Sequence, residues 1–483
     1  MQEIPAAAAD LNNIQGDIWS KGFPKHNETY YLFKIETGRA ADFARNLRKM
    51  VDEDQALKLI SNLSMVKGDQ ERITKEKKEA AQEGREPKKL PMINALIAFT
   101  YKGLQIVSTM ARRLDLEKVG ITDPAFSIGM KADGPDLNDP TTTTEPDDPL
   151  ANPDTIHGLL KVAGSSDDLV NERLKKIKDA LQHGTVINDA GGTKGRIDGA
   201  TRTDGNRGKE HFGFEDGISQ PLMNGSMKSR RTRIRMPMRN WMYGGSFLVF
   251  RKLEQDVAAF NHIKEDFKTY GCASPAHMGA KLMGRWPSGA PVTLEQFRIA
   301  DAPGKDHNIV KEMNNFGYEE LDPPPAIRPC PLASHIRKTN PRRLHQWLKQ
   351  SGDQGLKFSR IIRAGIPYGP DYAEDEPAGK KRGLLFACYQ GSIEDGFRHM
   401  QITWCNDEAF PLSDTGPDPI IGRVKAKAKI KKGENVKGTL ITEGFPPLPV
   451  NQPLVTFRGG EYFFVPSFEA MRGKLTAVDL INK

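Results

Sequence analysis

The chain has 483 residues and a formal net charge of +8, with 37% hydrophobic and 27% charged residues. At roughly 150 residues per domain, this length predicts two to four domains and a sizeable core without disulfide or metal cross-links. The composition excludes collagen-like and coiled-coil proteins, and 22 Phe, 10 Tyr and 5 Trp argue against extensive disorder. The basic balance, with a pI near 9.0, raises nucleic acid, a membrane surface or an acidic polymer as candidate partners.

The sequence contains no run of 18 apolar residues, so no transmembrane helix is expected. Residues 1–9 lack the charged and apolar regions of a signal peptide. This favours a protein that is not secreted by that route, or a chain that starts at a mature end. The cysteines show no CxxC spacing, so we expect buried free thiols rather than an iron–sulfur or zinc site. They are Cys272, Cys330, Cys388 and Cys405.

Hydrophobic periodicity and turn signals predict strands and helices in alternation. The first half predicts, in chain order, a strand at 30–35, a helix within 40–60, a charged helix or linker at 74–89, a strand at 93–101, a surface loop at 133–154, a strand at 155–162 and a helix at 169–181 capped by 165–168. The second half predicts a strand at 246–250, a helix at 255–270, a strand at 383–390, a helix at 392–403 and a late apolar segment at 463–466. The order predicts two similar α+β halves, joined near 224–239.

The segment 211–221 brackets two acids, Glu215 and Asp216, between Gly213 and Gly217. The glycines allow a tight backbone path or the close approach of a flat ligand. The flanking phenylalanines are able to desolvate a carboxylate and tune its pKa for proton transfer. The alternative is a turn with solvated acids.

A single histidine, His335, stands in the segment 334–342 beside three cationic residues. Haem iron needs only one protein ligand, and histidine is a common one, so a haem site leaves a sparse sequence pattern. Neither HExxH nor a cysteine pair occurs elsewhere in the chain. The alternative is an ordinary surface or core histidine.

Two arginines, Arg360 and Arg363, precede a Gly/Pro/Tyr bend at 365–369. An arginine directed into a pocket stabilises anionic charge that develops on a bound oxygen species. The alternative is a surface arginine pair.

These three segments, in this order, resemble the dye-decolorising peroxidases, most closely the fungal members. Segment 212–219 matches the GxxDG motif, His335 the proximal haem ligand, and Arg363 the distal arginine. His335 and Arg363 lie 28 positions apart, a spacing that fits fungal members. The resemblance runs from about residue 10 to about residue 470, and further matching segments are 13–18, 245–253, 283–291 and 416–422.

The resemblance implies an α+β fold of two ferredoxin-like modules, of the dimeric α+β barrel type, which form one haem-binding unit. We place the N-terminal module, with the GxxDG motif, at residues 1–232 and the C-terminal module at 233–483. One haem b per chain is implied, with the iron ligated axially by His335 and the site also formed by Phe214, Gly217, Arg363 and Asp418.

The implied reaction is the reduction of hydrogen peroxide, followed by one-electron oxidation of bulky dyes and phenolic or lignin-related aromatic compounds. Asp216 would act as the distal acid–base, with an acidic optimum, and Arg363 would stabilise charge. Asp418 would bond the other nitrogen of His335. Tyr368 and Trp404 are surface electron-transfer candidates, although Trp404 equally fits a core aromatic residue.

Family resemblance favours an extracellular monomer or homodimer, but the absence of a signal peptide leaves a cytoplasmic protein open. Ala364 stands where many relatives carry a second arginine, and both the stretch 228–239 and the whole chain are more basic than is usual in fungal members. These departures leave substrate preference and pH profile open. The alternatives are a non-catalytic haem-handling protein and a nucleic-acid-binding protein that uses 228–239. We expect neither nucleic acid nor membrane as a partner.

Overall fold

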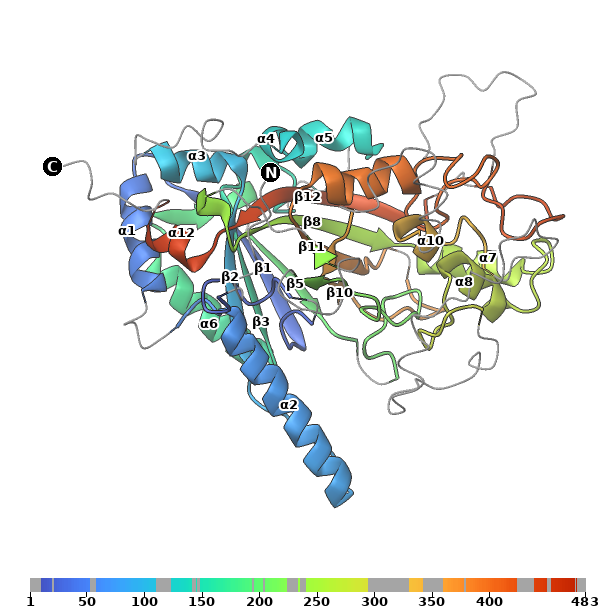
Figure 1. Ribbon diagram of the computed structural model, residues 1–483, viewed down its shortest axis with the longest axis horizontal. Coiled ribbons are helices and arrows are strands. Elements are labelled where there is room, and N and C mark those ends of the chain that lie inside the picture. Colours follow the sequence, from blue (N-terminus) through green and yellow to red (C-terminus); the bar gives the residue numbers. More distant parts are fainter. Residues whose placement is uncertain are drawn as a thin grey trace.

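The computed structural model (Figure 1) is built around one large antiparallel sheet with helices packed against it. It describes residues 10–19, 21–52, 58–109, 123–140, 145, 148–192, 195–202, 205–223, 233–234, 240–293, 330–341, 359–377, 379–423, 438–449, 453–473 and 475. Within these residues the sheet has ten strands in the order β10-β11-β8-β12-β2-β3-β1-β4, with β5 beside β1 and β9 beside β11. The bounds are β1 (Asn27–Ile35), β2 (Ile93–Phe99), β3 (Gly158–Gly164), β4 (Ile187–Asp189), β5 (Arg196–Ala200), β8 (Ser246–Gln255), β9 (Ile362–Arg363), β10 (Ile366–Tyr368), β11 (Gly383–Gln390) and β12 (Val455–Val465). A separate parallel pair is formed by β6 (Leu222–Met223) and β7 (Arg233–Ile234).

The sheet curves until strands from its two ends meet. Its halves join where Phe464 of β12 pairs with Phe99 of β2. At the other side β5 lies against β10. The contact is so close that a Cβ atom added to Gly199 of β5 would lie 2.8 Å from the carbonyl oxygen of Pro367 in β10. A residue without a side chain permits this approach. The strands therefore enclose a barrel.

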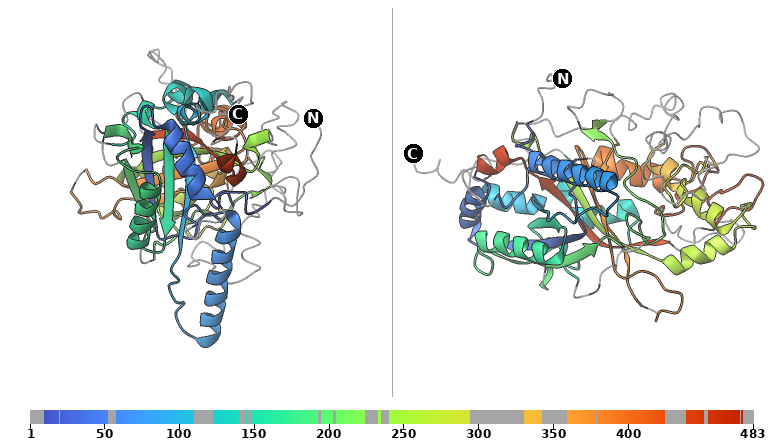
Figure 2. Two further views of the ribbon diagram at one scale, coloured as in Figure 1. Left: turned by 90° about the vertical axis from the view of Figure 1, so that its left-hand side faces the viewer. Right: turned by 90° about the horizontal axis from the view of Figure 1, so that it is seen from below.

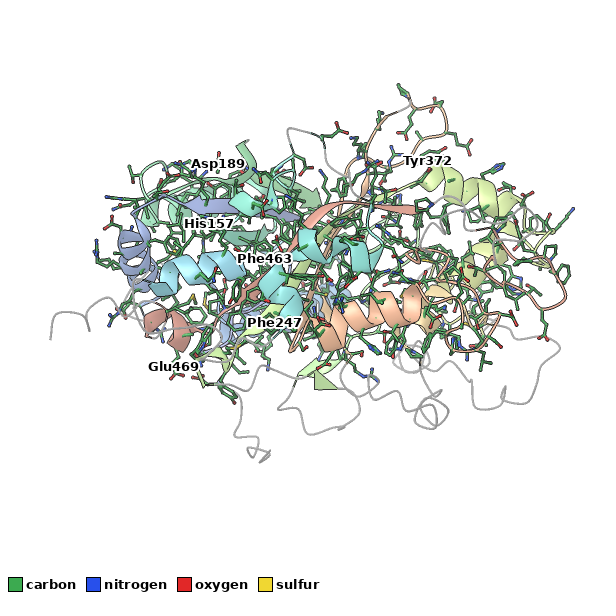
Figure 3. The ribbon with its side chains drawn as sticks, turned by 90° about the horizontal axis from the view of Figure 1, so that it is seen from above. His157, Asp189, Phe247, Tyr372, Phe463 and Glu469 are labelled. Carbon is green, nitrogen blue, oxygen red and sulfur yellow. The ribbon has the colours of Figure 1, made fainter. Side chains whose placement is uncertain are left out.

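Alternation of side chains along each strand separates an inner from an outer apolar layer. Phe463 lies in the inner layer and Phe247 in the outer layer, and both are labelled in Figure 3. The inner layer is continued by Tyr30, Leu32, Leu96, Ala98, Leu159, Leu248, Phe250, Leu385 and Tyr389. The outer layer is the surface on which the helices pack, and this two-layer arrangement buries most of the apolar residues.

The segment that precedes β1 enters the barrel and fills the gap between its halves. Nε2 of Gln15 donates to the carbonyls of Ile97 in β2, at 2.9 Å, and Pro466 after β12, at 2.8 Å. Oε1 of Gln15 accepts from the backbone N–H of Ile97 at 2.9 Å. One side chain thus replaces ladder hydrogen bonds between two strands. The same segment adds Ile14, Ile18 and Phe23 to the inner layer.

The helices lie mostly at the two ends of the sheet (Figures 1 and 2). Their bounds are α1 (Ala40–Val51), α2 (Leu63–Glu83), α3 (Tyr101–Thr109), α4 (Pro124–Ile128), α5 (Met130–Leu137), α6 (Asp167–Ala180), α7 (Val257–Glu265), α8 (Pro275–Met283), α10 (His335–Thr339) and α12 (Phe468–Arg472). Two wide, π-helical segments are η7 (Glu394–Arg398) and η8 (Met400–Cys405). Short 3-10 turns are η1 (Pro153–Thr155), η2 (Ala190–Gly192) and η3 (Asn240–Met242).

The predicted α+β class is confirmed, and most predicted elements are present with shifted bounds. The predicted cap of α6 is confirmed, because the Ser166 hydroxyl accepts from the N–H of Leu169. Three expectations need correction. The helix expected at 255–270 ends at Glu265, the loop expected at 133–154 begins within α5, and the helix expected at 392–403 is π-helical.

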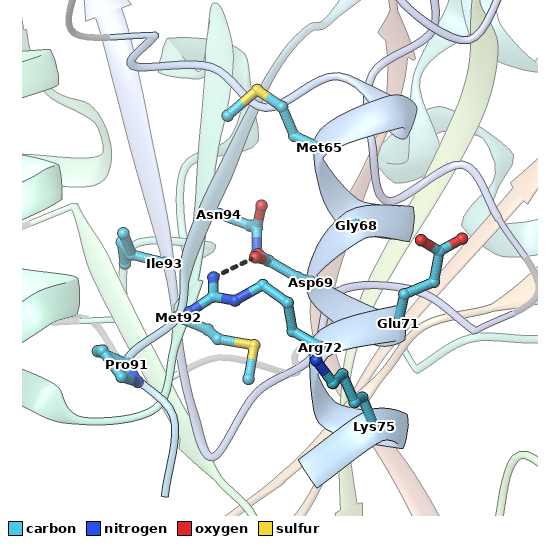
Figure 4. Close-up of a pocket in the computed structure, with 10 residues that line it drawn as sticks. All are labelled: Met65, Gly68, Asp69, Glu71, Arg72, Lys75, Pro91, Met92, Ile93 and Asn94. Atoms are coloured by element: carbon cyan, nitrogen blue, oxygen red, sulfur yellow. Dashed lines mark hydrogen bonds and ion pairs between the residues drawn. The ribbon is translucent and has the colours of Figure 1, made fainter.

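The charged stretch expected as a helix or linker belongs to α2, which projects from the body in Figures 1 and 2. The helix ends at Gly84, whose positive φ of 66° is typical of a glycine cap. An open groove of about 680 Å³ runs between α2 and the start of β2 (Figure 4). On its floor Asp69 accepts hydrogen bonds from Asn94 and Arg72. None of the three motifs lines this groove.

The predicted module boundary between residues 232 and 233 stays a prediction. Most of the join at 224–239, and with it the basic stretch 228–239, lies outside the described residues. All four cysteines are buried thiols outside any disulfide, as predicted. No helix in the described part of the chain has the length and apolarity to cross a membrane.

Candidate active site

A buried glutamate, Glu210, shapes the backbone that leads to the GxxDG motif. Its carboxylate accepts from the N–H groups of Phe212, at 2.8 Å, and Phe214, at 3.0 Å, and from Nε2 of Gln255 at 2.5 Å. Burial raises the pKa of Glu210 despite these donors. A carboxylate with several fixed donors rigidifies a turn that regular secondary structure does not hold. The charge of Asp216 also raises the pKa of Glu210, so the two carboxylates lie near each other.

Asp216 forms an ion pair with Arg363 although 147 positions separate them. The N–H of Gly217 donates to the same carboxylate oxygen at 2.6 Å. Burial pushes the pKa of Asp216 up, but the charge of Arg363 and these hydrogen bonds outweigh burial, so the pKa lies below its usual value. The carboxylate therefore remains a proton acceptor in mildly acidic solution.

The backbone and the guanidinium of Arg363 are both held by residues that follow Asp216. Gln220 accepts from the N–H of Arg363 at 3.0 Å and donates to its carbonyl at 2.6 Å. Nη2 of Arg363 donates to the carbonyl of Ser219 at 3.2 Å. On the opposite side, Arg363 pairs with Cys388 of β11. The GxxDG segment and β9, the strand of Arg363, thus form one hydrogen-bonded unit.

His335 is the first residue of α10 and pairs with a buried carboxylate. Its Nδ1 lies 2.8 Å from Oδ2 of Asp418. The other oxygen of Asp418 accepts from the N–H groups of Ile420, at 2.7 Å, and Ile421, at 3.0 Å. Burial lowers the pKa of His335, but the charge and hydrogen bond of Asp418 outweigh it and the pKa is raised. The pair fixes the imidazole so that Nδ1 faces Asp418 and Nε2 faces away.

Lys338, one turn after His335, anchors α10 at its back. Its ammonium donates to the carbonyls of Asp407, at 2.7 Å, and Trp404, at 3.2 Å, and to that of Phe410. Burial lowers its pKa to about 8. Sequence reasoning read this lysine only as one of three cations beside His335. No sequence pattern indicates that Lys338 is buried. Its burial follows from its place in the short helix α10, which only the fold shows.

Asp216, Arg363 and His335 lie near enough to one another for their charges to interact. Surrounding protein is the largest influence on the pKa of both Asp216 and His335, yet their side chains are 38% and 29% exposed. The charges of Arg363 and Asp216 both act on His335.

This region fits a haem. Within the described residues, no hydrogen bond reaches Nε2 of His335, which leaves that nitrogen as the donor for iron. A Cβ atom added to Gly213 or Gly217 would meet nothing within 4 Å, so there is open space beside the GxxDG turn for a flat group. The described residues contain no His, Cys, Asp or Glu cluster that would hold a bare metal ion. One axial histidine, rather than a multi-ligand cage, is what the site offers.

The remaining predicted site residues lie inside the protein. Phe214 packs edge-on against Phe260, behind the turn that carries Asp216. Tyr368 is 9% exposed, and its hydroxyl has no partner among the described residues. Trp404 is 2% exposed and stacks on Phe410. The electron-transfer roles of Tyr368 and Trp404 stay predictions.

Comparison with known proteins matches both halves of the chain to one family. The DyP dimeric alpha+beta barrel domain matches residues 13–202, and the Dyp-type peroxidase C-terminal domain matches 208–410. Peroxidase 2 of Mycetinis scorodonius is 31% identical over 512 residues, which cover 98% of this chain and 90% of the relative. The chain belongs to the dye-decolorising peroxidase family.

Other dye-decolorising peroxidases agree over the whole fold. AauDyP1 of Auricularia auricula-judae is 29% identical over 98% of this chain and 89% of its own. An ancestral D-type dye-decolorising peroxidase has a TM-score of 0.74 at 33% identity, covering 98% of this chain and all of that one. A dye-decolorising peroxidase in complex with 2,6-dimethoxyphenol has a TM-score of 0.73 at 28% identity, covering 97% of this chain and all of that one. The predicted family, barrel-type fold and enzyme class are confirmed.

Proposed function

We propose that the chain binds one haem b through Nε2 of His335, reduces hydrogen peroxide, and oxidises bulky dyes and phenolic compounds in one-electron steps. The observation that carries the proposal is that two pairs, His335 with Asp418 and Asp216 with Arg363, lie near enough for the charges of Asp216 and Arg363 to act on His335. A protein that only carries haem needs the first pair but not the second.

Haem supplies, when bound, the iron that binds peroxide and takes up its oxidising equivalents. Asp216 would accept the proton from one oxygen of hydrogen peroxide and return it to the other, so that water leaves. Its lowered pKa keeps it able to accept that proton in acidic solution, which supports an acidic optimum. Arg363 stabilises the negative charge that builds up on the departing oxygen.

On the proximal side, Asp418 holds the ring of His335 and increases the basicity of Nε2 through the shared Nδ1 proton. Lys338 keeps α10 in place, and with it the backbone of His335. Phenols are supported as reductants by the neighbour that holds 2,6-dimethoxyphenol. Resemblance to fungal relatives further favours work outside the cell.

The test is an absorption spectrum of the purified, haem-loaded protein before and after hydrogen peroxide is added. Wild-type protein is expected to show a Soret band that changes within seconds of adding peroxide. His335→Ala is expected to lose the band, whereas His262→Ala, at an exposed position of α7, keeps it. Asp216→Asn is expected to keep the band but to react 10²- to 10⁴-fold more slowly with peroxide. A normal Soret band in His335→Ala would refute the ligand assignment, and a wild-type rate in Asp216→Asn the acid–base assignment.

A further inference from the structure

Four charged side chains are buried together inside the barrel, away from the haem-facing pairs. Nζ of Lys161 lies 2.6 Å from Oδ2 of Asp17 and 3.3 Å from Oε2 of Glu28. Nζ of Lys25 lies 2.6 Å from the same oxygen of Glu28. Three of these side chains are fully buried and that of Lys25 is 12% exposed. The hydroxyl of Tyr389 donates to Oδ2 of Asp17 at 2.5 Å.

Burying four charged side chains together is unfavourable in free energy. Removing each ion from water is unfavourable, and ion pairs in a core are often no more stabilising than apolar residues of the same volume. The surrounding inner layer is apolar, so apolar side chains at these four positions would pack against similar neighbours. Stability alone therefore does not account for two lysines and two carboxylates at this place.

Both lysines also donate to one backbone oxygen. Nζ of Lys161 lies 2.9 Å, and Nζ of Lys25 3.1 Å, from the carbonyl oxygen of Ala364. Ala364 directly follows Arg363, and its N–H donates to Ala387 of β11 at 2.8 Å. A carbonyl that receives two ammonium groups is held far more tightly than one in an ordinary strand.

We propose that Asp17, Lys25, Glu28 and Lys161, called the barrel clamp below, form a positioning device that fixes the strand of Arg363 and thereby the contact of its guanidinium with Asp216. The inference deepens the proposed function and rests on it. Gln220 holds the strand at Arg363 itself, and the barrel clamp holds it one residue later. The barrel clamp also explains the segment 13–18, which matches the family and supplies Asp17 but does not lie among the residues proposed for the chemistry.

Lys25→Met is the decisive variant, because it removes one donor to Ala364 and leaves Lys161 to balance the two carboxylates. The double variant Lys25→Met/Glu28→Gln removes one ion pair without changing the net charge, and it serves if the single variant does not fold. The matched control is Lys281→Met, since Lys281 is a buried lysine of α8 whose Nζ donates to the hydroxyl of Thr442 at 2.7 Å, far along the chain from the strand of Arg363.

Two readouts separate positioning from mere stability. The first is hydrogen exchange in peptides that span 359–368, measured by mass spectrometry on the full chain, which needs no catalysis. We expect exchange at least tenfold faster in Lys25→Met and unchanged in Lys281→Met. The second is the pH profile of the reaction of the haem-loaded protein with peroxide. Burial raises the pKa of Asp216, and the charge of Arg363 lowers it. The other charged groups nearby are His335 and Glu210. A loosened Arg363 therefore moves the acid limb to higher pH and slows the reaction about tenfold.

Unchanged exchange at 359–368 in both Lys25 variants overturns the inference, whatever the wild type does with peroxide. Faster exchange together with an unmoved acid limb also overturns it, because the strand would then loosen without affecting Arg363. A wild-type protein that binds haem but does not react with peroxide instead refutes the proposed function, and the exchange data still decide whether the barrel clamp holds the strand.

Discussion

Nδ1 of His335 lies 2.8 Å from Oδ2 of Asp418, although 83 positions separate the two residues. The carboxylate is fully buried and takes two further backbone donors, whereas the imidazole is partly open on its other side. A buried anion that is fixed by backbone N–H groups does not rotate, so it dictates the orientation of the ring. The segment 416–422, recognised in the sequence only as a matching motif, is thus the support of the proximal ligand.

Asp418→Asn should reduce peroxide turnover by about 10- to 100-fold while haem remains bound. An asparagine carbonyl still accepts from Nδ1 of His335, but it removes the negative charge that increases the basicity of Nε2. The measurement is steady-state turnover beside the Soret spectrum and the reduction potential of the iron, which should rise. Asp407→Asn is the control, because Asp407 lies in the same region and contacts Lys338 through its backbone only. A wild-type potential in Asp418→Asn would contradict the role of the carboxylate.

The sequence predicted the residues with chemistry but not those that hold them. His335, Asp216 and Arg363 stand in short local patterns, and local patterns are readable from a single chain. Gln220 and Lys338 act through backbone groups of segments far along the chain, and no pattern of residue types announces such a pairing.

For the fold, too, the local elements were predictable and their long-range arrangement was not. Alternation and periodicity predicted most strands and helices. The closure of β5 against β10 and the insertion of β12 between β8 and β2 depend on long-range packing. The π-helical form of η7 and η8 was not predictable either; in η7 the N–H of Phe397 donates to Oε1 of Gln390, a residue of β11.

Tyr368→Phe should lower the oxidation of bulky anthraquinone dyes about tenfold, equivalent to about 1.4 kcal/mol, and spare small phenols. The side chain is buried and its hydroxyl has no partner in the described part of the chain, so the change should cost little stability. Removing the hydroxyl blocks oxidation of the ring with loss of its proton, which a route through this residue requires. The measurement is kcat/KM for a dye and for 2,6-dimethoxyphenol, with Trp404→Phe as the companion variant. Equal losses on both substrates would argue against an electron route through Tyr368.

Glu461→Gln should stabilise the protein above neutral pH and leave it unchanged in acid. Glu461 of β12 accepts from the N–H groups of Met130, at 2.8 Å, and Tyr462, at 2.7 Å, but burial prevails and raises its pKa from 4.5 to about 7. Below pH 4.5 the carboxyl is protonated in both the folded and the unfolded chain. As the pH rises to 7, the unfolded chain gains from ionisation and the folded chain does not, so about 3 kcal/mol of stability is lost.

Glutamine resembles the protonated acid, because its carbonyl oxygen still accepts from both backbone N–H groups and it never ionises. The melting temperature of Glu461→Gln should therefore match that of the wild type at pH 4.5 and exceed it by several degrees at pH 8. Glu469→Gln, at an exposed position of α12 that is labelled in Figure 3, is the matched control and should shift neither value. If Glu461→Gln melts at the wild-type temperature at both pH values, Glu461 is already ionised in the folded protein at little cost, and its burial does not limit the alkaline stability of the barrel.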